Sequence, residues 1–328
     1  MPALGLILAG GLALGAYQAG AYATLAADGR FTVSAVAGSS IGAINGAIIL
    51  GNPAAVAAER LAAFWAQVAA DPLDPFGLGF APPRATSWAS IAATRLTGVP
   101  GIARPRPWAL ATGGSSLYGN EPLIRSLAQF VDFDRLNASR FIAVTTDLHS
   151  ADAVAIDSAR VAVAPEHLAA AGGLLPNFPA MALDGRWLGD GGLSANLPYE
   201  PFVASDRAGA PARLLAIELF APRPGDPVTL GDAAERSNDV KYASQSRLRL
   251  AGLVRERALE AALHPERSGQ RLAQISYAGA DEKGGMEKMF DCSHAALRQR
   301  WDAGARDAAA VLDWLAEPPP ERGLLVRS

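Results

Sequence analysis

The sequence contains very little cysteine and histidine. Cys292 is the only cysteine among the 328 residues, so they form no intrachain disulfide and no four-cysteine zinc site. The histidines are His149, His167, His264 and His294, and no two have the i, i+4 spacing of a helical zinc site. We therefore expect neither a metal nor an organic cofactor.

A strong excess of charge of either sign is also absent. The chain has 29 Lys and Arg against 32 Asp and Glu, a formal charge of −3, and 50% of its residues are apolar. This composition excludes a mainly disordered chain. It also gives no general attraction to nucleic acid, because nucleic-acid-binding domains are usually basic. At roughly 150 residues per domain, the length fits one large domain or two smaller ones.

The first 27 residues carry no charged side chain. A secretory signal needs a basic segment ahead of its apolar stretch, and this sequence has none there. A transmembrane helix needs about 20 mostly apolar residues, but repeated glycines and Gln18 interrupt this stretch. We therefore expect a buried strand and helix, in a cytoplasmic or membrane-peripheral protein and not in a secreted one.

The opening fifty residues alternate between short apolar runs and helix patterns. The runs at 4–9 and 33–37 are typical of strands buried on both faces, and helix patterns follow at 15–27 and 43–50. This alternation predicts an α/β fold with a largely parallel sheet. Further strands are expected at 141–146, 153–156, 186–188, 214–219 and 273–277, and further helices at 54–70, 121–130, 165–171, 230–263 and 293–316.

Two segments break this pattern. Residues 71–116 are rich in proline and glycine, which predicts an irregular insertion with one short helix near 87–96. Such a long loop is either a lid over a site or a plain connection, and both readings stay open. Residues 318–320 are three prolines, which predict the start of a frayed tail.

The segment Gly38-Ser39-Ser40-Ile41-Gly42 fits the pattern G-x-S-x-G. In this pattern a nucleophilic serine occupies a strained turn between a strand and a helix, and small residues two positions away remove clashes. Here a strand pattern precedes Ser40 and a helix pattern follows it. The amino end of that helix favours developing negative charge beside the hydroxyl.

A glycine-rich turn, Gly10 to Gly15, follows the first expected strand. Its backbone N–H groups are free to point at a phosphate or an oxyanion. No Gly-Lys-Ser/Thr follows, which excludes a phosphate-binding P-loop. Leu12 stands where a dinucleotide fingerprint would have glycine, so a Rossmann cofactor site is poorly supported.

A third motif, Asp190-Gly191-Gly192, follows the expected strand at 186–188. Asp-Gly is a common turn signal, and a turn without chemistry is one reading. The other reading is that the Asp190 carboxylate accepts the hydroxyl proton of a serine as that serine attacks an acyl carbonyl.

Together and in this order, the three motifs resemble the patatin-like phospholipases, which use a Ser–Asp dyad without histidine. The resemblance covers about residues 4–220, and 228–316 is similar to the helical extension of a bacterial patatin-like subgroup. It rests on the segments 9–20, 38–47, 171–179 and 190–198.

The resemblance implies a three-layer αβα fold with a mostly parallel central sheet and added C-terminal helices. It implies a catalytic domain at 1–225, which includes the insertion, and an extension at 226–328 packed on the same domain. The implied substrate is a lipid or another ester, met in solution or at a membrane surface. The oligomeric state stays open.

The resemblance also implies a role for each matching residue. Ser40 would be the nucleophile and Asp190 its general base, and burial beside Ser40 should raise the pKa of the carboxyl from its usual value near 4. The implied oxyanion hole consists of the backbone N–H groups of Gly10, Gly11, Leu12 and Ile41. The glycines implied to support the motifs are Gly15, Gly38, Gly42, Gly191 and Gly192.

Other functions stay open. A Ser-His-Asp esterase would need His149 or His167 within reach of Ser40. A weakened or inactive relative that binds lipid or a partner is the third possibility, because Leu12 and Leu14 stand where the family usually has glycine and Arg or Lys. Leu12 would keep an oxyanion-hole N–H if its φ stays below zero. The basic residues of 230–263 fit a docking helix or a solvated face.

Overall fold

A nine-stranded mixed sheet forms the centre of the part of the chain that the structure describes. The structure is a computed structural model and describes residues 1–204, 209–222, 225–279 and 285–328. The strand order is β11-β10-β9-β1-β2-β5-β8-β7, with β6 paired to β5. The strands of this sheet are β1 (Ala3–Leu8), β2 (Thr32–Ser39), β5 (Arg140–Asp147), β6 (Ala153–Asp157), β7 (Met181–Leu183), β8 (Arg186–Asp190), β9 (Arg213–Glu218), β10 (Gln270–Ser276) and β11 (Leu324–Arg327).

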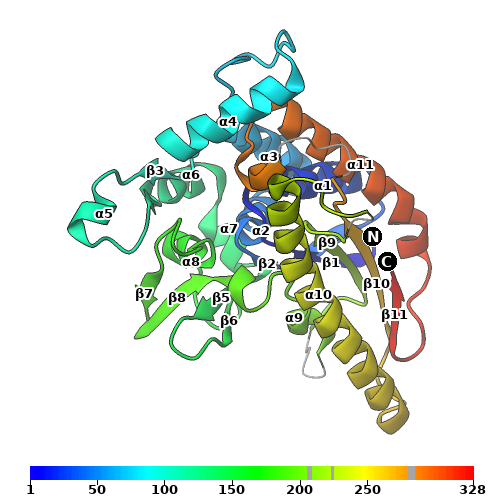
Figure 1. Ribbon diagram of the computed structural model, residues 1–328. Helices are drawn as coiled ribbons and strands as arrows, with labels where there is room; N and C mark the ends of the chain where they lie inside the picture. Colours follow the sequence, from blue (N-terminus) through cyan, green and yellow to red (C-terminus); the bar gives the residue numbers. More distant parts are fainter. Residues whose placement is uncertain (205–208, 223–224, 280–284) are drawn as a thin grey trace.

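The six strands from β11 to β5 pair in parallel, whereas β6, β7 and β8 pair antiparallel. Strand β1 is central, and its residues 4–8 are all buried, because helices cover both faces of the sheet (Figure 1). This burial explains why its sequence is apolar without alternation. The predicted α/β fold is confirmed.

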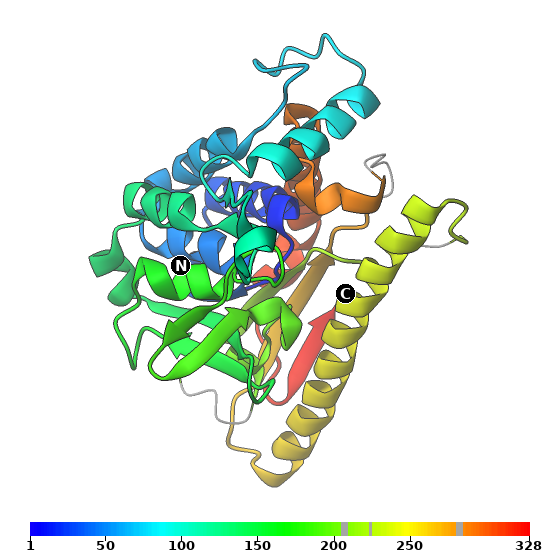
Figure 2. The same cartoon turned by 60° about the vertical axis from the view of Figure 1, so that its left-hand side comes forward.

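Helices lie on both faces of the sheet, and the two chain termini, which overlap in the view of Figure 1, stand apart in Figure 2. The helices are α1 (Ala16–Asp28), α2 (Ile41–Leu50), α3 (Ala54–Val68), α4 (Pro83–Thr97), α5 (Ala109–Thr112), α6 (Glu121–Phe130), α7 (Phe133–Asn137), α8 (Pro165–Ala171), α9 (Glu200–Val203), α10 (Leu230–Leu263) and α11 (His294–Ala316). Three short 3₁₀ segments accompany them, η1 (Leu12–Gly15), η2 (Gly191–Leu193) and η3 (Gly285–Phe290).

Helix α11 packs directly on α1 at two glycines. A Cβ atom on Gly20 would collide with the Trp301 carbonyl, and one on Gly304 would collide with the Tyr17 carbonyl. The Tyr17 hydroxyl also donates a 2.7 Å hydrogen bond to Asp307. This contact joins the C-terminal region to the first helix of the fold.

The insertion contains more regular structure than the sequence predicts. Helix α4 spans fifteen residues, and α5 and a two-stranded pairing of β3 (Arg104–Pro105) with β4 (Tyr118–Gly119) follow it. The expectation of a single short helix near 87–96 is therefore wrong. Pro83 sits in the first turn of α4, where a missing N–H is tolerated, so the prolines begin this helix instead of preventing it.

The tail after the three prolines is also ordered, contrary to prediction. Residues 324–327 form β11, which pairs in parallel with β10 from Gln270 to Ala273. The prolines end α11, and the chain then turns back to the edge of the sheet. No helix within the described residues is long and apolar enough to cross a membrane.

Candidate active site

The three sequence motifs meet at one edge of the sheet. The glycine-rich turn follows β1 and Ser40 follows β2, which is parallel to β1. Asp190 ends β8 and lies opposite Thr145, near the carboxyl end of β5. Carboxyl ends of neighbouring parallel strands are the usual place for a binding site in an open α/β sheet.

Ser40 occupies a strained turn between β2 and α2. Its φ is 51° and its ψ is −127°, a region that residues other than glycine rarely adopt. The turn is tight because a Cβ atom on Gly38 would meet the backbone of Gly42, and one on Gly42 would meet the carbonyl of Leu8. The expectation of a sharp strand-to-helix turn is confirmed, and its glycines are required by close backbone approach.

The carboxylate of Asp190 is buried beside the Ser40 hydroxyl. Burial raises its pKa to about 6, against the opposing effects of hydrogen bonds from the Ser40 hydroxyl and the Gly192 N–H and of the Lys241 charge. The Gly192 N–H donates to Oδ1 at 2.6 Å. A group with this pKa is a much better proton acceptor near neutral pH than an ordinary aspartate.

The glycine-rich turn leaves only part of its expected oxyanion hole available. The Gly10 N–H donates to the Asn196 carbonyl at 3.2 Å, so the prediction that it serves an oxyanion is at odds with the structure. Within the described part of the chain, the N–H groups of Gly11, Leu12 and Ile41 have no acceptor. Leu12 has a φ of 48°, so the expectation that its N–H is available only at a negative φ is wrong: the φ is positive and the N–H still has no acceptor in the described part of the chain.

Asn196 joins the turn, the serine and the aspartate loop. Its carbonyl accepts the Gly10 N–H, and a Cβ atom on Gly10 would approach both Asn196 and Ser40 closely. The Ser39 hydroxyl donates to the Ala195 carbonyl at 2.7 Å. The loop after Asp190 is therefore fixed against the serine turn from two sides.

A buried polar network fixes the glycine-rich turn from behind. Asn45 of α2 donates to the Gly15 carbonyl at 3.0 Å and to Gln18 at 2.9 Å. Gln18 in turn donates to the Ala9 carbonyl at 2.8 Å, and Trp65 donates to Asn45 at 3.2 Å. These bonds hold both ends of the turn.

A pocket opens on Ser40 and Asp190. Its polar end consists of the glycine-rich turn, the two motif side chains, Gly192 and Asn196. The remaining wall is mostly apolar, and its apolar side chains are those of Ile41, Ile44, Ile102, Leu123, Ala169, Leu174, Phe178, Phe220, Tyr242, Met289 and Phe290. The arrangement suits an ester whose carbonyl lies at Ser40 and whose hydrocarbon chain lies against this wall.

Helix α10 completes the site. The sequence did not predict this contribution. Tyr242 lines the pocket against Phe220, with ring centroids 4.6 Å apart, and Lys241 lies 5.0 Å above the Tyr242 ring. Gln245 accepts the Asn196 N–H at 2.6 Å, and Arg249 donates to the Ser194 carbonyl at 2.9 Å. Positions 242, 245 and 249 share one helix face, the only signal that the sequence offered.

The comparisons with known proteins address the same region. The family model for patatin-like phospholipase matches residues 6–203, which include all three motifs. The chain belongs to the patatin-like phospholipase family. Membership implies serine acyl hydrolase activity on a lipid substrate.

Among solved structures, VipD from Legionella pneumophila matches this patatin-like protein at 12% sequence identity. The match covers 92% of this chain and 67% of that chain, with a TM-score of 0.38. No curated protein matches the sequence.

The histidines lie elsewhere in this patatin-like protein. His149 is exposed in the turn between β5 and β6, 3.9 Å from Asp147, and the His167 ring accepts the N–H of Ala164 at the start of α8. None of the described residues that line the pocket is a histidine. Within the same residues, no three His, Cys, Asp or Glu side chains are grouped to hold a metal ion.

The patatin-like site also departs from the family pattern at Leu14. This side chain is completely buried, so no cation occupies that position. Lys241 of α10 instead supplies a positive charge close enough to lower the pKa of Asp190. Cys292 is fully buried and its pKa is raised to about 12, which makes it an unreactive thiol at neutral pH.

Proposed function

We propose that this protein hydrolyses lipid esters with Ser40 as the nucleophile and Asp190 as its general base. Ser40 Oγ attacks the ester carbonyl carbon while its proton passes to the Asp190 carboxylate. The negative charge that develops on the carbonyl oxygen is stabilised by the N–H groups of Gly11 and Leu12, with Ile41 beside them.

The tetrahedral intermediate then collapses and breaks the ester bond. The proton on Asp190 passes to the departing alkoxide, which leaves as an alcohol, and the acyl group remains on Ser40. A water molecule attacks this acyl-enzyme, and Asp190 accepts its proton. Collapse of the second intermediate releases the fatty acid and returns the proton to Ser40 Oγ.

The burial of the Asp190 carboxylate beside Ser40 in one pocket carries this proposal. Burial gives Asp190 a proton affinity suited to accepting the proton of the Ser40 hydroxyl. Neither histidine named as an alternative base lies in the pocket wall, which favours the dyad over a histidine triad.

We also propose how the chain is divided. We infer a catalytic unit at 1–225 and an extension at 226–328, as in a bacterial patatin-like subgroup. In this extension β10 and β11 continue the central sheet and α10 contributes Tyr242 to the pocket. The extension thus belongs to the same body as the catalytic unit and is needed for the complete site.

The proposal is tested by hydrolysis of a soluble chromogenic short-chain ester by purified protein. Ser40→Ala removes the nucleophile, and Asp190→Asn keeps the shape of the side chain but cannot accept a proton. We expect each to lower kcat by at least about 10³-fold with the circular dichroism spectrum unchanged.

The control variant is His149→Ala, which should keep full activity. Loss of activity in His149→Ala, with Asp190→Asn still active, would instead establish a histidine-based esterase. Equal activity in wild type and Ser40→Ala would refute the nucleophile. No turnover by wild type on a panel of esters would favour a binding protein.

A further inference from the structure

The insertion exposes most of its large apolar side chains to solvent. Phe76 is 81% exposed and Phe80 is 85% exposed, at the tip of the loop that precedes α4. The other exposed large apolar residues between 71 and 116 are Leu73, Leu78, Trp88, Leu96 and Trp108. Single exposed apolar residues are normal on a protein surface, but seven within one segment indicate an interaction site.

The loop that carries Phe76 and Phe80 is held in its projecting form. The Asp74 carboxylate accepts the N–H groups of Leu78 at 2.8 Å and Gly79 at 2.7 Å. Arg298 of α11 donates to the carbonyl of Gly77 at 3.4 Å. The aromatic rings therefore point away from a fixed loop, which projects beyond the rest of the fold (Figure 1).

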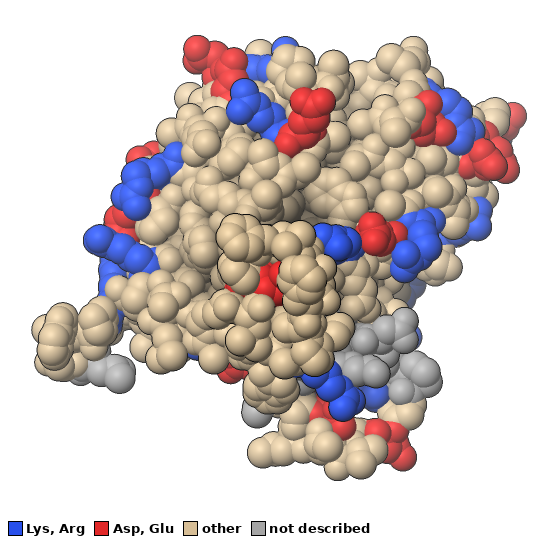
Figure 3. Space-filling model, turned by 90° about the horizontal axis from the view of Figure 1, so that it is seen from above, with Lys and Arg blue, Asp and Glu red and all other residues tan. Residues whose placement is uncertain are grey.

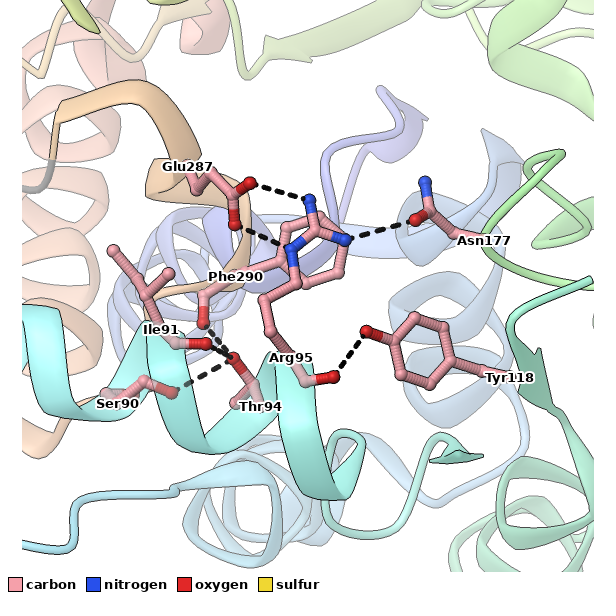
Figure 4. Close-up of polar contacts among 8 residues, drawn as sticks. All are labelled: Ser90, Ile91, Thr94, Arg95, Tyr118, Asn177, Glu287 and Phe290. Carbon is pink, nitrogen blue, oxygen red and sulfur yellow. Dashed lines mark hydrogen bonds and ion pairs between the residues drawn. The ribbon is translucent and has the colours of Figure 1, made fainter. Parts of the chain in front are cut away.

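Helix α4 is turned so that its polar side faces the protein. Ser90 and Thr94 are completely buried, and the Thr94 hydroxyl lies within 3.0 Å of the carbonyl oxygens of Ser90, Ile91 and Phe290, to which it can donate its proton (Figure 4). Trp88 and Leu96 lie on the opposite, exposed side. A helix that only faced water would have the reverse arrangement.

The insertion exposes no acidic side chain of its own, although Arg104 and Arg106 pair with Glu121, and Arg95 with Glu287, of neighbouring segments. Residues 71–116 contain four arginines, Arg84, Arg95, Arg104 and Arg106, and only two acidic residues, Asp71 and Asp74. Both aspartates are buried and accept backbone N–H groups. Figure 3 views the molecule from this side, and uncharged atoms fill most of the middle of the face while charged groups lie mainly around it.

We propose that this insertion face, formed by Phe76, Leu78, Phe80, Trp88, Leu96 and Trp108, docks on a lipid bilayer that contains anionic lipids. The aromatic and aliphatic side chains insert at the level of the headgroups, where such side chains are favoured. Arg84, which is exposed four residues after Phe80, contacts lipid phosphates. Exposed aromatic rings in a segment without an exposed acidic side chain favour an anionic lipid surface over a second copy of the chain.

The insertion face also connects to the proposed active site. Arg95 on α4 forms a two-point ion pair with Glu287 and lies 3.6 Å above the ring of Phe290, which lines the pocket (Figure 4). Ile102 of the insertion lines the same pocket. Docking rests on the proposed function in one way: the bilayer would supply the ester that the protein hydrolyses.

Cosedimentation with vesicles tests the docking. We compare phosphatidylcholine vesicles with vesicles that also contain phosphatidylglycerol, at low and high salt. Wild type should bind the anionic vesicles more tightly, and salt should weaken the binding. The double variant Phe76→Ser/Phe80→Ser should lose at least about tenfold in affinity, because two rings no longer leave water.

The matched control is Leu259→Ser/Leu263→Ser, at two exposed leucines of α10 that lie outside the insertion. It should bind vesicles as wild type does. Unchanged vesicle binding by Phe76→Ser/Phe80→Ser, or an equal loss in the control, would overturn the proposal. The proposal would also be overturned if wild type did not bind vesicles, formed a dimer in light scattering, and became a monomer on the double substitution Phe76→Ser/Phe80→Ser.

Two further measurements separate docking from catalysis. Ser40→Ala should bind anionic vesicles as wild type does, whatever its activity. Phe76→Ser/Phe80→Ser should hydrolyse the soluble ester at the wild-type rate, because neither residue lines the pocket. If wild type fails to bind vesicles yet hydrolyses the soluble ester, docking is refuted and the dyad stands.

Discussion

Leu12 sits in the glycine-rich turn with a φ of 48°, a region that residues other than glycine rarely adopt. A side chain in this left-handed region costs about 1–2 kcal/mol relative to glycine. Leu12→Gly and Leu12→Ala both lose the apolar side chain, so their difference isolates this backbone strain. We expect Leu12→Gly to be more stable than Leu12→Ala by about 1 kcal/mol in urea unfolding.

Leu14 provides the control for that comparison. It lies in the same turn, is buried and does not have a positive φ. There the order should reverse, with Leu14→Ala more stable than Leu14→Gly by about 0.5–1 kcal/mol. The same order of Ala and Gly at both positions would show that Leu12 is not strained.

The pKa of Asp190 leads to a second prediction at the same scale. The proposed base must be ionised, and its pKa is about 6. The kcat/KM for an uncharged soluble ester should therefore fall as the pH drops below about 6 and be constant above it. Because the Lys241 charge lowers this pKa, Lys241→Gln should move the midpoint to higher pH, by roughly a few tenths of a unit.

Arg255→Gln removes an exposed charge from the same helix and serves as the matched variant. Its midpoint should equal that of wild type. A midpoint in Lys241→Gln that stays at the wild-type value would mean that the α10 cation does not act on Asp190.

At the scale of elements, α10 holds the loop that carries the proposed base. Gln245 is the acceptor for the Asn196 N–H, and Asn196 also binds the glycine-rich turn. Gln245→Leu leaves that N–H without a partner at a cost of about 1–3 kcal/mol, and the loop should shift. We expect kcat to fall about tenfold with KM changed less than about twofold.

Gln245→Glu keeps an acceptor oxygen and should restore most of the lost kcat. Arg247→Leu changes an exposed residue of the same helix and should have wild-type kinetics. A stable Gln245→Leu protein with wild-type kcat would show that α10 packs on the site without positioning it.

Elements with a continuous apolar pattern could be predicted from the sequence, and those formed by long-range pairing could not. The strands near Ser40 and the helix at 230–263 were expected, because burial on both faces and helical periodicity leave local signals. Strand β7 has three residues, and α7 has five. Such short elements are stabilised by their neighbours and leave almost no pattern of their own.

In the candidate site, too, residues within local motifs could be predicted from the sequence, and contacts between distant segments could not. Ser40 and Asp190 lie in motifs, because a tight turn restricts the residues beside them. The loss of the Gly10 N–H to Asn196 depends on a contact across 186 positions, which no local pattern reveals. Tyr242 and Gln245 were missed because their roles follow from where the helix crosses the site, not from their neighbours in sequence.

At the scale of the whole molecule, the C-terminal region is part of the central sheet. β10 pairs with β9 on one side and with β11 on the other, and Leu272 and Ala273 at its centre are fully buried. Helix α11, which joins these two strands, packs on α1. We expected an extension of helices at 226–328 packed on the catalytic domain. Because two of its strands are part of the central sheet, the extension contributes more to the stability of the fold than such helices would.

Truncation after Gly323 tests this contribution, because it removes β11 and nothing before it. The backbone of β10 then becomes an unpaired edge, so the free energy of unfolding should fall by about 2 kcal/mol or more. An exposed edge also promotes aggregation, which should appear as concentration-dependent light scattering. Leu325→Ser keeps the backbone pairing and changes a side chain that is 42% exposed, so it should lower stability much less than the truncation does. If the truncated protein unfolds at the same urea concentration as the full chain and stays monomeric, β11 does not stabilise the sheet.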